Sequence, residues 1–383
     1  MVEVALAGKT NSGKSSFFKA STMIDVEISN RPFVTIKPNE GAAYVTVECT
    51  EKEFGIKCKP RTGFCKDGIR YIPIKLWDIA GLVPGAHEGR GLGLQFLDDI
   101  RQAAVLLHIV DFSGTTDSEG LPTENYDPED DIKFVENEIN LWFIDVVKRN
   151  VEKIKKLPSG KAEILDLLQQ QSSGLGVTRE QLSQTLDECS ISEIESFAKR
   201  LREKSKPILI VSNKIDLKKS QENFERLKVK YISIVPVSAD SEIALRKASE
   251  KGLINYNGGN GFGLTENLDA AQKKVLELIK GEVVDKYGST GVQECLNKAV
   301  FEILNYIAVY PVADANKLTN KDGNILPDVF LVPNGTTMKE FAFKVHTQLG
   351  EKFITGLDAK TKMRLSADHK LKNKDVVSIV FGR

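Results

Sequence analysis

One short segment constrains the fold of this chain more than any other: GKTNSGKS, residues 8–15, which fits the pattern Gly-x-x-x-x-Gly-Lys-Ser/Thr. It follows the apolar run Val2–Ala7 and opens a helical pattern, the setting in which such a loop binds phosphate groups. Glycines let the backbone wrap the phosphates, and the amide N–H groups with the helix N-terminus supply partial positive charge. We predict that Lys14 bridges the β- and γ-phosphates and that Ser15 binds Mg²⁺. The residues of this loop predicted to contact a nucleotide are Asn11, Ser12, Gly13, Lys14, Ser15 and Ser16.

Short aliphatic runs predict the architecture around this loop. They alternate with helical patterns, which indicates an α/β fold, a P-loop nucleotide-binding fold with a doubly wound, mostly parallel sheet. The predicted strands are Val2–Ala7, Tyr71–Trp77, Ala104–Val110, Pro207–Ser212 and Ile232–Val237. Ligands bind such sheets at the carboxyl ends of the strands. Asp78, Asp111 and Asn213 each stand where one of these runs stops.

Between the third and fourth runs the pattern is helical alone. The segment DPEDDIKFVENEINLWFIDVVKRN begins with Asp127 as N-cap and Pro128 at the first helical position, and it repeats apolar residues at helical spacing. Two further helix starts carry capping boxes, Thr178 with Gln181 and Ser190 with Glu193. We expect an inserted helical lobe over residues 121–205, which serves either as a spacer or lid or as a docking arm. The nucleotide-binding domain then comprises residues 1–120 and 206–305.

The last part of the chain, residues 306–383, predicts a small β-grasp domain. Strands are expected at YIAVYPV, DVFLVP and DVVSIVF, with a helix after NGTT that carries Phe341, Val345 and Leu349 on one face. This part holds 10 Lys and 2 Arg against 8 Asp and Glu, whereas the whole chain has no net charge. Its surplus lysines are available for contacts with an RNA backbone. The alternative is a domain that packs on the nucleotide-binding domain and stabilises it.

A second motif lies in WDIAGLVPGAHEG, residues 77–89. An Asp-x-x-Gly turn after a strand lets Asp78 hold Mg²⁺ through a water, while the Gly81 amide meets a γ-phosphate and loosens when that phosphate leaves. Upstream, RPFVTIKPNEG offers Thr35 as the hydroxyl of a loop that closes over the metal. The predicted metal-binding residues are therefore Ser15, Thr35 and Asp78.

A third motif, SNKIDL at residues 212–217, determines the expected base. A carboxylate at Asp216 accepts the N1–H and N2–H₂ groups of guanine, whereas adenine offers an acceptor at N1 and no amino group at C2. Asn213 and Lys214 would brace the base and the phosphate loop, and Ser238 with the Ala239 amide would meet the base oxygen. The three motifs together predict binding of GTP and GDP.

The residues also carry a family resemblance over nearly the whole chain. NRPFVTIKPNEG, DIAGLVPGAHEGRGLGLQFLDDIRQA and YGSTGVQE resemble the Obg superfamily of P-loop GTPases, and more closely its YchF subfamily, in which a helical domain is inserted. LPDVFLVPNGTTMKEFAFKVHTQLGEKF resembles a TGS domain, a β-grasp module. The resemblance implies a translation-associated function linked to the ribosome or RNA. Many YchF proteins have an altered base motif and prefer ATP, whereas the intact Asn-Lys-Ile-Asp resembles the archaeal, GTP-specific branch.

Catalysis is the least determined part of the prediction. Many such switches have a glutamine after Gly81 that orients the attacking water, and this chain has Leu82. The resemblance implies an apolar residue there, so Leu82 does not argue against hydrolysis. The residues predicted to serve catalysis are Lys14, Thr35, Gly81 and His87, the last as a group that approaches the water. Asn11 either helps to bind K⁺ beside the phosphates or only shapes the loop.

The cysteines point away from a disulfide framework. They are odd in number and contain no Cys-x-x-Cys pair: Cys49, Cys58, Cys65, Cys189 and Cys295. Cys58 and Cys65 flank the turn-rich segment CKPRTGFC. A metal site there needs four ligands and has no histidine nearby, so we interpret these residues as reduced thiols.

The function expected from the sequence is a slow, Mg²⁺-dependent GTPase switch that associates with the ribosome or RNA through the β-grasp domain and the helical lobe. A nucleotide-gated binding module with negligible turnover is the first alternative, and an ATP-preferring ATPase is the second. The N-terminus enters a strand without a basic segment, and no apolar stretch is long enough to span a membrane. We therefore expect a cytoplasmic protein without DNA or membrane partners, and the sequence leaves the oligomeric state open.

Overall fold

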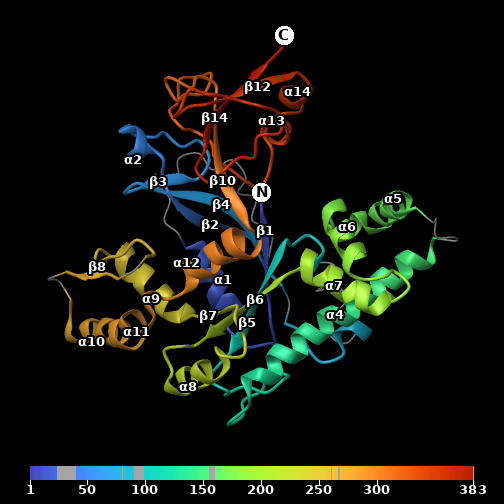
Figure 1. Ribbon diagram of the computed structural model, residues 1–383. Coiled ribbons are helices and arrows are strands. Elements are labelled where there is room, and N and C mark those ends of the chain that lie inside the picture. The colour runs from blue at the N-terminus through green and yellow to red at the C-terminus, as the bar shows by residue number, and fades with distance from the viewer. Residues whose placement is uncertain are drawn as a thin grey trace.

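The structure, a computed structural model, describes residues 1–23, 40–79, 81–89, 99–154, 160–259, 261–265 and 268–382. In these residues a large sheet lies at the centre of the molecule, the helical lobe extends from one side of it, and a second sheet lies at the end near the C-terminus (Figure 1). Among the described residues, no helix is both long enough and apolar enough to cross a lipid bilayer.

The central sheet confirms the predicted P-loop α/β fold. In the described part of the chain it has seven strands: β1 (Glu3–Ala7), β2 (Glu40–Glu48), β3 (Phe64–Lys66), β4 (Ile69–Asp78), β5 (Val105–Asp111), β6 (Ile208–Asn213) and β7 (Ile234–Pro236). Their order is β2-β4-β1-β5-β6-β7, with β3 beside β4. Strands β4, β1, β5, β6 and β7 run parallel, whereas β2 and β3 pair antiparallel with β4. The five parallel strands were all predicted from the sequence, whereas β2 and β3 were not.

The parallel register brings the motif residues to one edge of this sheet. Leu6 pairs with Asp78 across β1 and β4, and Asp111 pairs with Asn213 across β5 and β6. All four positions lie at the carboxyl ends of their strands, where ligands of doubly wound sheets bind. Segments far apart in the sequence therefore form one site.

Strand β1 also shows why the sheet is covered on both faces. Its side chains alternate, so Val4 and Leu6 enter one hydrophobic core and Ala5 and Ala7 enter another. The first core contains α1 (Lys14–Thr22) and α12 (Val292–Asn297). The second core is shared with the helical lobe.

The remaining short elements include η2, which lies in the helical lobe between α5 (Lys161–Ser172) and α6 (Arg179–Glu188). They are α2 (Glu51–Phe54), η1 (Ala86–Glu88), η2 (Ser173–Leu175), α8 (Lys218–Leu227), α9 (Ala239–Glu250), β8 (Ile254–Asn255), β9 (Gly263–Leu264), α10 (Ala270–Ile279), η3 (Lys280–Val284), α11 (Asp285–Tyr287) and η4 (Lys298–Ile303).

The helical lobe consists of α4 (Pro128–Glu152), α5 (Lys161–Ser172), α6 (Arg179–Glu188) and α7 (Ile194–Ser205). Helix α4 has the predicted N-cap, because Asp127 accepts a hydrogen bond from the Glu129 N–H, and Thr178 forms the predicted capping box with Gln181. The capping box predicted for Ser190 is wrong. Its hydroxyl oxygen accepts from the Ser192 N–H instead, and α7 begins after Glu193 without a side-chain cap. A local turn has taken the place of the helix start.

The second sheet has the order β11-β10-β14-β12-β13 and forms the predicted β-grasp domain. Its strands are β10 (Tyr306–Val312), β11 (Phe330–Pro333), β12 (Phe353–Asp358), β13 (Arg364–Leu365) and β14 (Val376–Phe381). Helix α13 (Met338–Val345) packs on it through Phe341. The helix predicted after NGTT begins as expected at Met338, but it does not reach Leu349, because His346 is extended and caps a separate helix, α14 (Thr347–Glu351).

One face of this second sheet continues the core of the central sheet. On β10, Ile307 and Val309 face α13, whereas Ala308, Tyr310 and Val312 join the core formed around β1 and β4. The β-grasp domain therefore packs tightly on the rest of the chain, as the stabilising alternative in the sequence analysis required. Deletion of residues 306–383 would expose that core.

Candidate nucleotide-binding site

The phosphate loop adopts a backbone that requires glycine at two positions. Gly8 and Gly13 have φ values of 146° and 97°. A Cβ atom on Gly8 would lie 2.4 Å from the Ile109 carbonyl oxygen, and one on Gly13 would lie 2.1 Å from Asn213 Nδ2. Positive φ and close approach both exclude a side chain here. The loop then enters α1, whose first turn contains Lys14, Ser15 and Ser16.

Lys14 is folded back over this loop. Its ammonium group donates to the carbonyl oxygens of Gly8 (3.1 Å) and Lys9 (2.7 Å) and is largely buried. Burial lowers the pKa of Lys14 to about 8, against the opposing effect of the Asp78 charge. A bound phosphate would favour the charged form, because it supplies a nearby negative charge.

Two of the three predicted metal ligands meet. The Ser15 hydroxyl donates to Asp78 Oδ2 at 2.9 Å, which joins the start of α1 to the end of β4. A hydroxyl and a carboxylate beside a phosphate loop are the hard oxygen donors that Mg²⁺ prefers, so these residues fit that ion. Thr35, the third predicted ligand, lies outside the described residues.

The base motif is joined directly to the phosphate loop. Asn213 Nδ2 donates to the Ser12 carbonyl oxygen at 3.0 Å, and Asn213 Oδ1 accepts from the Ala239 N–H at 3.3 Å. Asp216 Oδ1 accepts from the Ser238 hydroxyl at 2.7 Å. The side chains predicted to read the base are thus held together at the start of α9.

Lys214 forms an ion pair behind the base motif, and its predicted role in bracing the base and the phosphate loop stays a prediction. Its ammonium group lies 2.8 Å from Asp111 Oδ2, and Asp111 is buried at the end of β5. Asp111 also accepts from the hydroxyls of Ser113 and Thr116. Burial acts to raise the pKa of Asp111, but these donors together with Lys214 lower it below its ordinary value. This ion pair fixes the turn that presents the base motif.

The segment YGSTGVQE supports the base loop from behind. The Thr290 carbonyl oxygen accepts from the Ser238 N–H at 3.0 Å. Gly291 has a φ of 81°, and a Cβ atom there would lie 2.0 Å from the Pro236 carbonyl oxygen. In the sequence this segment carries only a family resemblance, whereas in the structure it positions the base loop.

The segment after Asp78 packs on the phosphate loop. The Leu82 N–H donates to the Gly8 carbonyl oxygen at 3.0 Å, and the Leu82 side chain is 1% exposed, in the core shared with the helical lobe. A Cβ atom on Gly81 would lie 2.7 Å from the Thr10 hydroxyl. Leu82 therefore contributes packing and has no means of orienting a water.

His87 is held by the helical lobe. Its Nδ1 lies 2.7 Å from Glu138 Oε2 on α4, and Glu138 also accepts from the N–H groups of Gly85 (2.8 Å) and His87 (3.0 Å). Burial acts to raise the pKa of Glu138, and these donors outweigh it, so the pKa lies below its ordinary value. In this arrangement His87 connects the segment to α4, and its predicted role toward a water stays a prediction.

Asn11 lies at the outer side of the phosphate loop. Its Nδ2 donates to the Gly120 carbonyl oxygen at 3.0 Å, and its φ is 61°. This contact supports the loop-shaping role, and the role in binding K⁺ stays a prediction.

One buried ion pair at this site was not predicted from the sequence. Lys9 Nζ lies 2.7 Å from Asp131 Oδ2, with both side chains 1% exposed, and it donates to the Thr116 carbonyl oxygen. Burial raises the pKa of Asp131 to about 6 although Lys9 opposes it. The pair joins the phosphate loop to the first turn of α4. Lys9 stands at a variable position of the motif and Asp131 looks like an ordinary helix-start residue, so no local signal pointed to them.

Comparison with known proteins decides the family. A family model described as 50S ribosome-binding GTPase matches residues 3–214, one described as Obg-like GTPase YGR210-like, G4 motif-containing domain, matches residues 211–314, and the TGS domain matches residues 317–381. A GTP-binding protein of Methanocaldococcus jannaschii is 45% identical over 391 residues, 99% of each chain. The chain belongs to the YchF/Obg-like GTPases.

Two further relatives extend this assignment. The crystal structure of a GTP-binding protein from Pyrococcus horikoshii is 33% identical, covers 100% of both chains and superimposes with a TM-score of 0.79. The ribosome-binding ATPase YchF of Mycoplasma genitalium is 33% identical over 221 residues, 56% of each chain. The YchF/Obg-like assignment therefore covers the whole chain, and the resemblance inferred from the sequence is confirmed.

Proposed function

We propose that this protein binds GTP with Mg²⁺, hydrolyses it slowly, and uses its nucleotide state as a switch for association with the ribosome. The observation that carries the proposal is the set of hydrogen bonds that connects the phosphate loop to the base loop. Because Asn213 bonds to both Ser12 and Ala239, the phosphate loop and the base loop are fixed relative to each other. A nucleotide that spans both loops would find its two sites already positioned.

Asp216 supports guanine as the base. A carboxylate accepts both N–H groups on the Watson–Crick edge of guanine and has no such pair on adenine. The Ser238 hydroxyl bonds to Asp216 Oδ1 and thereby fixes the carboxylate at the mouth of the base loop. We therefore infer the nucleotide from Asp216 and not from the relatives that are named as ATPases.

Replacement of Asp216 tests the proposal. Asp216→Asn exchanges a double acceptor for one acceptor and one donor, so we expect the affinity for GDP to fall by about 2–4 kcal/mol, or roughly 30- to 1000-fold. Affinity for xanthosine diphosphate should rise, because its C2 carbonyl accepts the new donor. Asp145→Asn, an exposed change on α4, is the control. Unchanged GDP affinity in Asp216→Asn, or stronger competition by ADP than by GDP against labelled GTP, would remove guanine specificity from the proposal.

The chemistry at the phosphates follows from residues of this chain. Ser15, Asp78 and Thr35 would hold Mg²⁺, which neutralises phosphate charge. Lys14 supplies a second positive charge, and the Gly81 backbone would respond to the γ-phosphate. Since Leu82 is buried, these groups position the reaction without a water-orienting glutamine, which supports slow turnover.

A monovalent cation near Asn11 would compensate for the missing glutamine. Single-turnover hydrolysis in K⁺ and in Na⁺ tests this step. A faster rate in K⁺ supports the cation, and equal rates assign Asn11 to loop shape alone. Absence of turnover in either salt would favour the alternative of a nucleotide-gated binding module.

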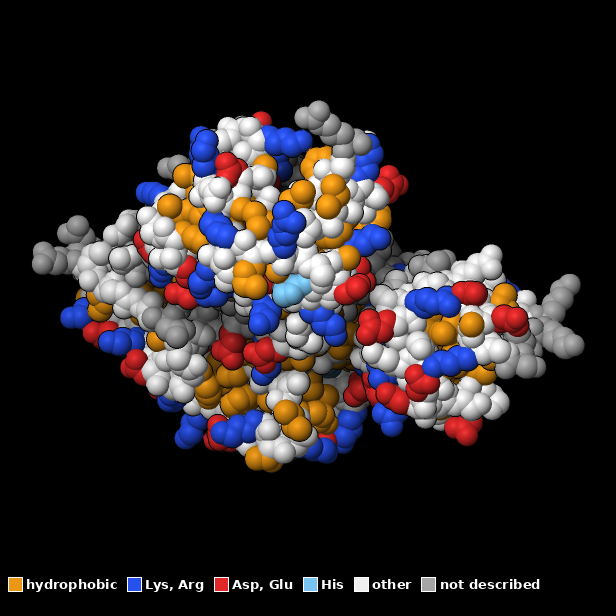
Figure 2. All heavy atoms as spheres, turned by 45° about the horizontal axis from the view of Figure 1, so that its top comes forward, with side chains coloured by type: hydrophobic (Ala, Val, Ile, Leu, Met, Phe, Trp, Pro, Cys, Tyr) orange, Lys and Arg blue, Asp and Glu red, His pale blue; other side chains and the backbone are white. Residues whose placement is uncertain are grey.

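The surface of the TGS domain supports a ribosomal or RNA partner. Figure 2 shows Lys and Arg side chains spread over this domain with apolar side chains between them. The exposed apolar residues there are Phe343, Ile354, Met363, Val380 and Phe381. Phosphate contacts from lysine would weaken steeply with salt. Sedimentation with ribosomes in GDP and in a non-hydrolysable GTP analogue is the test, and equal sedimentation in both would reject the switch.

We propose a separate role for each part of the chain. Residues 1–120 and 206–305 form the nucleotide-binding domain, residues 121–205 the helical lobe and residues 306–383 the TGS domain. The lobe and the TGS domain would contact the partner, and a ribosomal partner would place the protein in the cytoplasm.

A further inference from the structure

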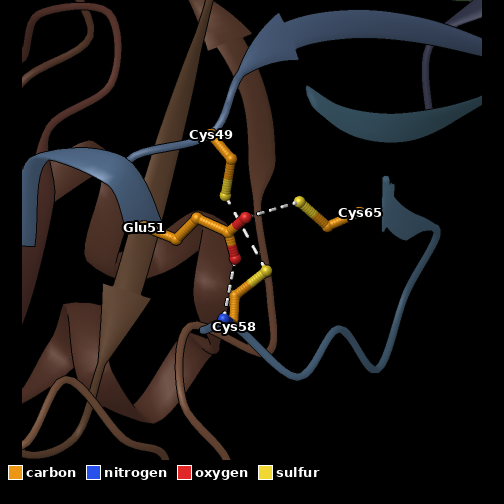
Figure 3. A group of neighbouring side chains, drawn as sticks. All are labelled: Cys49, Glu51, Cys58 and Cys65. Carbon is orange, nitrogen blue, oxygen red and sulfur yellow. Dashed lines mark hydrogen bonds between the residues drawn. The ribbon is translucent and has the colours of Figure 1, made fainter. Parts of the chain in front are cut away.

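Three cysteines and a glutamate converge near the TGS domain, outside the nucleotide-binding site. Cys49 follows β2, Glu51 lies on α2, Cys58 lies in the following connection and Cys65 lies on β3 (Figure 3). Their side chains point toward one another from four positions of one chain segment. We call these four residues the cysteine cluster.

The distances in the cysteine cluster match those around one small metal ion. One ligand atom from each residue lies within 4.8 Å of all the others. Cys49 Sγ and Cys58 Sγ are 3.8 Å apart, and Cys65 Sγ is 3.4 Å from Glu51 Oε1. A tetrahedral zinc site with the usual bond lengths predicts about 3.8 Å between two sulfur ligands and about 3.5 Å between a sulfur and an oxygen ligand.

The second oxygen of the glutamate is already anchored. Glu51 Oε2 accepts from the Cys58 N–H at 2.8 Å, while Oε1 faces Cys65. Ligating carboxylates commonly have such an outer hydrogen bond, which fixes their orientation. The cluster therefore presents a preformed donor set.

Buried positive charge beside the cluster supports thiolate ligands. Arg70 is 0% exposed, its NH1 lies 3.8 Å from Cys58 Sγ, and its other described bonds go to the carbonyl oxygens of Thr62, Leu326 and Pro327. Among the described residues, no ion pair joins the Arg70 guanidinium to a carboxylate. A buried cation needs a compensating negative charge, and metal-bound thiolates would supply it.

We propose that Cys49, Glu51, Cys58 and Cys65 bind one Zn²⁺ ion in a structural site that fastens the segment 49–66 to the TGS domain. Three thiolates and one carboxylate in tetrahedral arrangement form a closed donor set of the kind that favours zinc over harder ions. The three thiol protons leave to solvent when the ion binds. The site requires no bound nucleotide and is independent of the proposed function.

The position of the cluster indicates what the ion does. The Lys59 N–H donates to the Ile325 carbonyl oxygen (2.8 Å), and the Arg61 N–H donates to that of Pro327 (2.9 Å). These bonds tie the connection between Cys58 and Cys65 to the loop before β11. An ion that holds both ends of this connection would keep it in the conformation that meets the TGS domain.

Metal analysis of the full-length protein tests the proposal. Protein purified under reducing conditions without chelator should contain about one zinc per chain. Cys58→Ser and Cys65→Ser should lose most of that zinc, whereas Cys189→Ser, a cysteine of the helical lobe, should keep it. Far-ultraviolet circular dichroism and a thermal unfolding curve of each variant show whether the protein has folded.

Cobalt substitution keeps the test decisive where a cysteine variant fails to fold. Protein stripped of zinc and loaded with Co²⁺ should show thiolate-to-cobalt charge-transfer absorption and tetrahedral ligand-field bands. Glu51→Gln should shift the ligand-field bands while the charge-transfer absorption remains, because only the oxygen ligand changes. Three outcomes overturn the proposal: no zinc and no cobalt spectrum in the wild-type protein, zinc retained in Cys58→Ser, or a Cys49–Cys58 disulfide in protein isolated with thiols blocked.

Discussion

The helical lobe and the TGS domain are both attached to the central sheet, but they hold different parts of it. The lobe packs on the segment after Asp78, where Leu82 lies in the shared core and Glu138 binds the backbone of Gly85 and His87. The TGS domain contacts β4 and the segment 49–66. On β4, Arg70 donates to the carbonyl oxygens of Leu326 and Pro327, in the loop before β11. One attachment involves a segment expected to respond to nucleotide, and the other involves strands of the sheet edge.

This difference indicates how a nucleotide signal would travel. Release of the γ-phosphate loosens the Asp-x-x-Gly turn in switches of this type. The contacts of Glu138 carry such a change to α4, and the Lys9–Asp131 pair gives the phosphate loop a second connection to the same helix. The TGS domain would instead keep a constant position. We therefore expect the lobe to report the nucleotide state and the TGS domain to provide a permanent binding surface.

The largest expected loss of stability comes from removing the contacts by which Arg70 attaches the TGS domain to the central sheet. Arg70→Met keeps much of the side-chain volume and removes the guanidinium hydrogen bonds to the carbonyl oxygens of Leu326 and Pro327, although Pro327 keeps the Arg61 N–H as a donor. A hydrogen bond to a charged group contributes about 1.5–3 kcal/mol, so losing both bonds should cost about 3 kcal/mol or more at this interface. Amide hydrogen exchange of β11 should then quicken by roughly 150-fold.

The same variant should leave the nucleotide site intact. GDP affinity is expected to stay within about twofold of the wild type, because the contacts of Arg70 with described residues all lie outside the nucleotide site. Arg61→Gln is the matched control: Arg61 bonds to Asp328 at 2.8 Å with its own side chain 63% exposed. Exposed pairs contribute about 0–1 kcal/mol. If Arg61→Gln and Arg70→Met change hydrogen exchange in β11 equally, the buried contacts of Arg70 stabilise this interface no more than the exposed pair of Arg61 does.

A smaller effect is expected from Leu82→Gln, which restores the glutamine of other switches. The side chain at position 82 lies in the core that the lobe shares with the sheet. A buried amide there should cost about 2–3 kcal/mol and should quicken amide hydrogen exchange in α4 but not in β11. Single-turnover hydrolysis should not become faster. Leu264→Gln, at an exposed leucine, is the control. Faster hydrolysis in Leu82→Gln would mean that this side chain reaches the water after all.

These positions also show what the sequence could predict. The P-loop, the Asp78 turn and the Asn213–Asp216 motif are contiguous, and each places its groups through local backbone conformation. Parallel pairing then brings them to one edge of the sheet, so a sound prediction of the strands was enough to assemble most of the site. Antiparallel β2 was missed, and with it the edge on which the TGS domain is attached.

Other features depend on tertiary contacts that no local pattern encodes. The cysteine cluster combines residues at spacings of no familiar metal motif, and its fourth ligand is a glutamate on a four-residue helix. Arg70 looks like an ordinary charge in a strand, yet it is buried beneath a loop about 250 positions later. Ser190 matched a capping box in sequence, but its hydroxyl was taken by a nearer N–H. In each case a distant or competing partner decided the outcome.

The smallest expected change in stability, and the sharpest test of the comparison, is Glu138→Ala. It removes the acceptor of two backbone N–H groups and of the His87 ring, a local loss of about 1–3 kcal/mol. Exchange at residues 84–89 should quicken about tenfold or more, with GDP affinity and β11 unchanged. The difference in α4 exchange between GDP and a GTP analogue should shrink.

The charge of Glu138 sets the conditions for this experiment. Its pKa is depressed in the folded protein, so its contribution to stability is complete above the ordinary glutamate value and is lost as the pH falls through the lowered value. Measurements near pH 7 therefore report the intact contact. Glu138→Gln, which keeps one acceptor, should show a partial effect, and Glu152→Ala on the same helix should show none. If α4 responds to nucleotide as strongly in Glu138→Ala as in the wild type, the signal does not pass through His87 and Gly85, and the Lys9–Asp131 pair becomes its route.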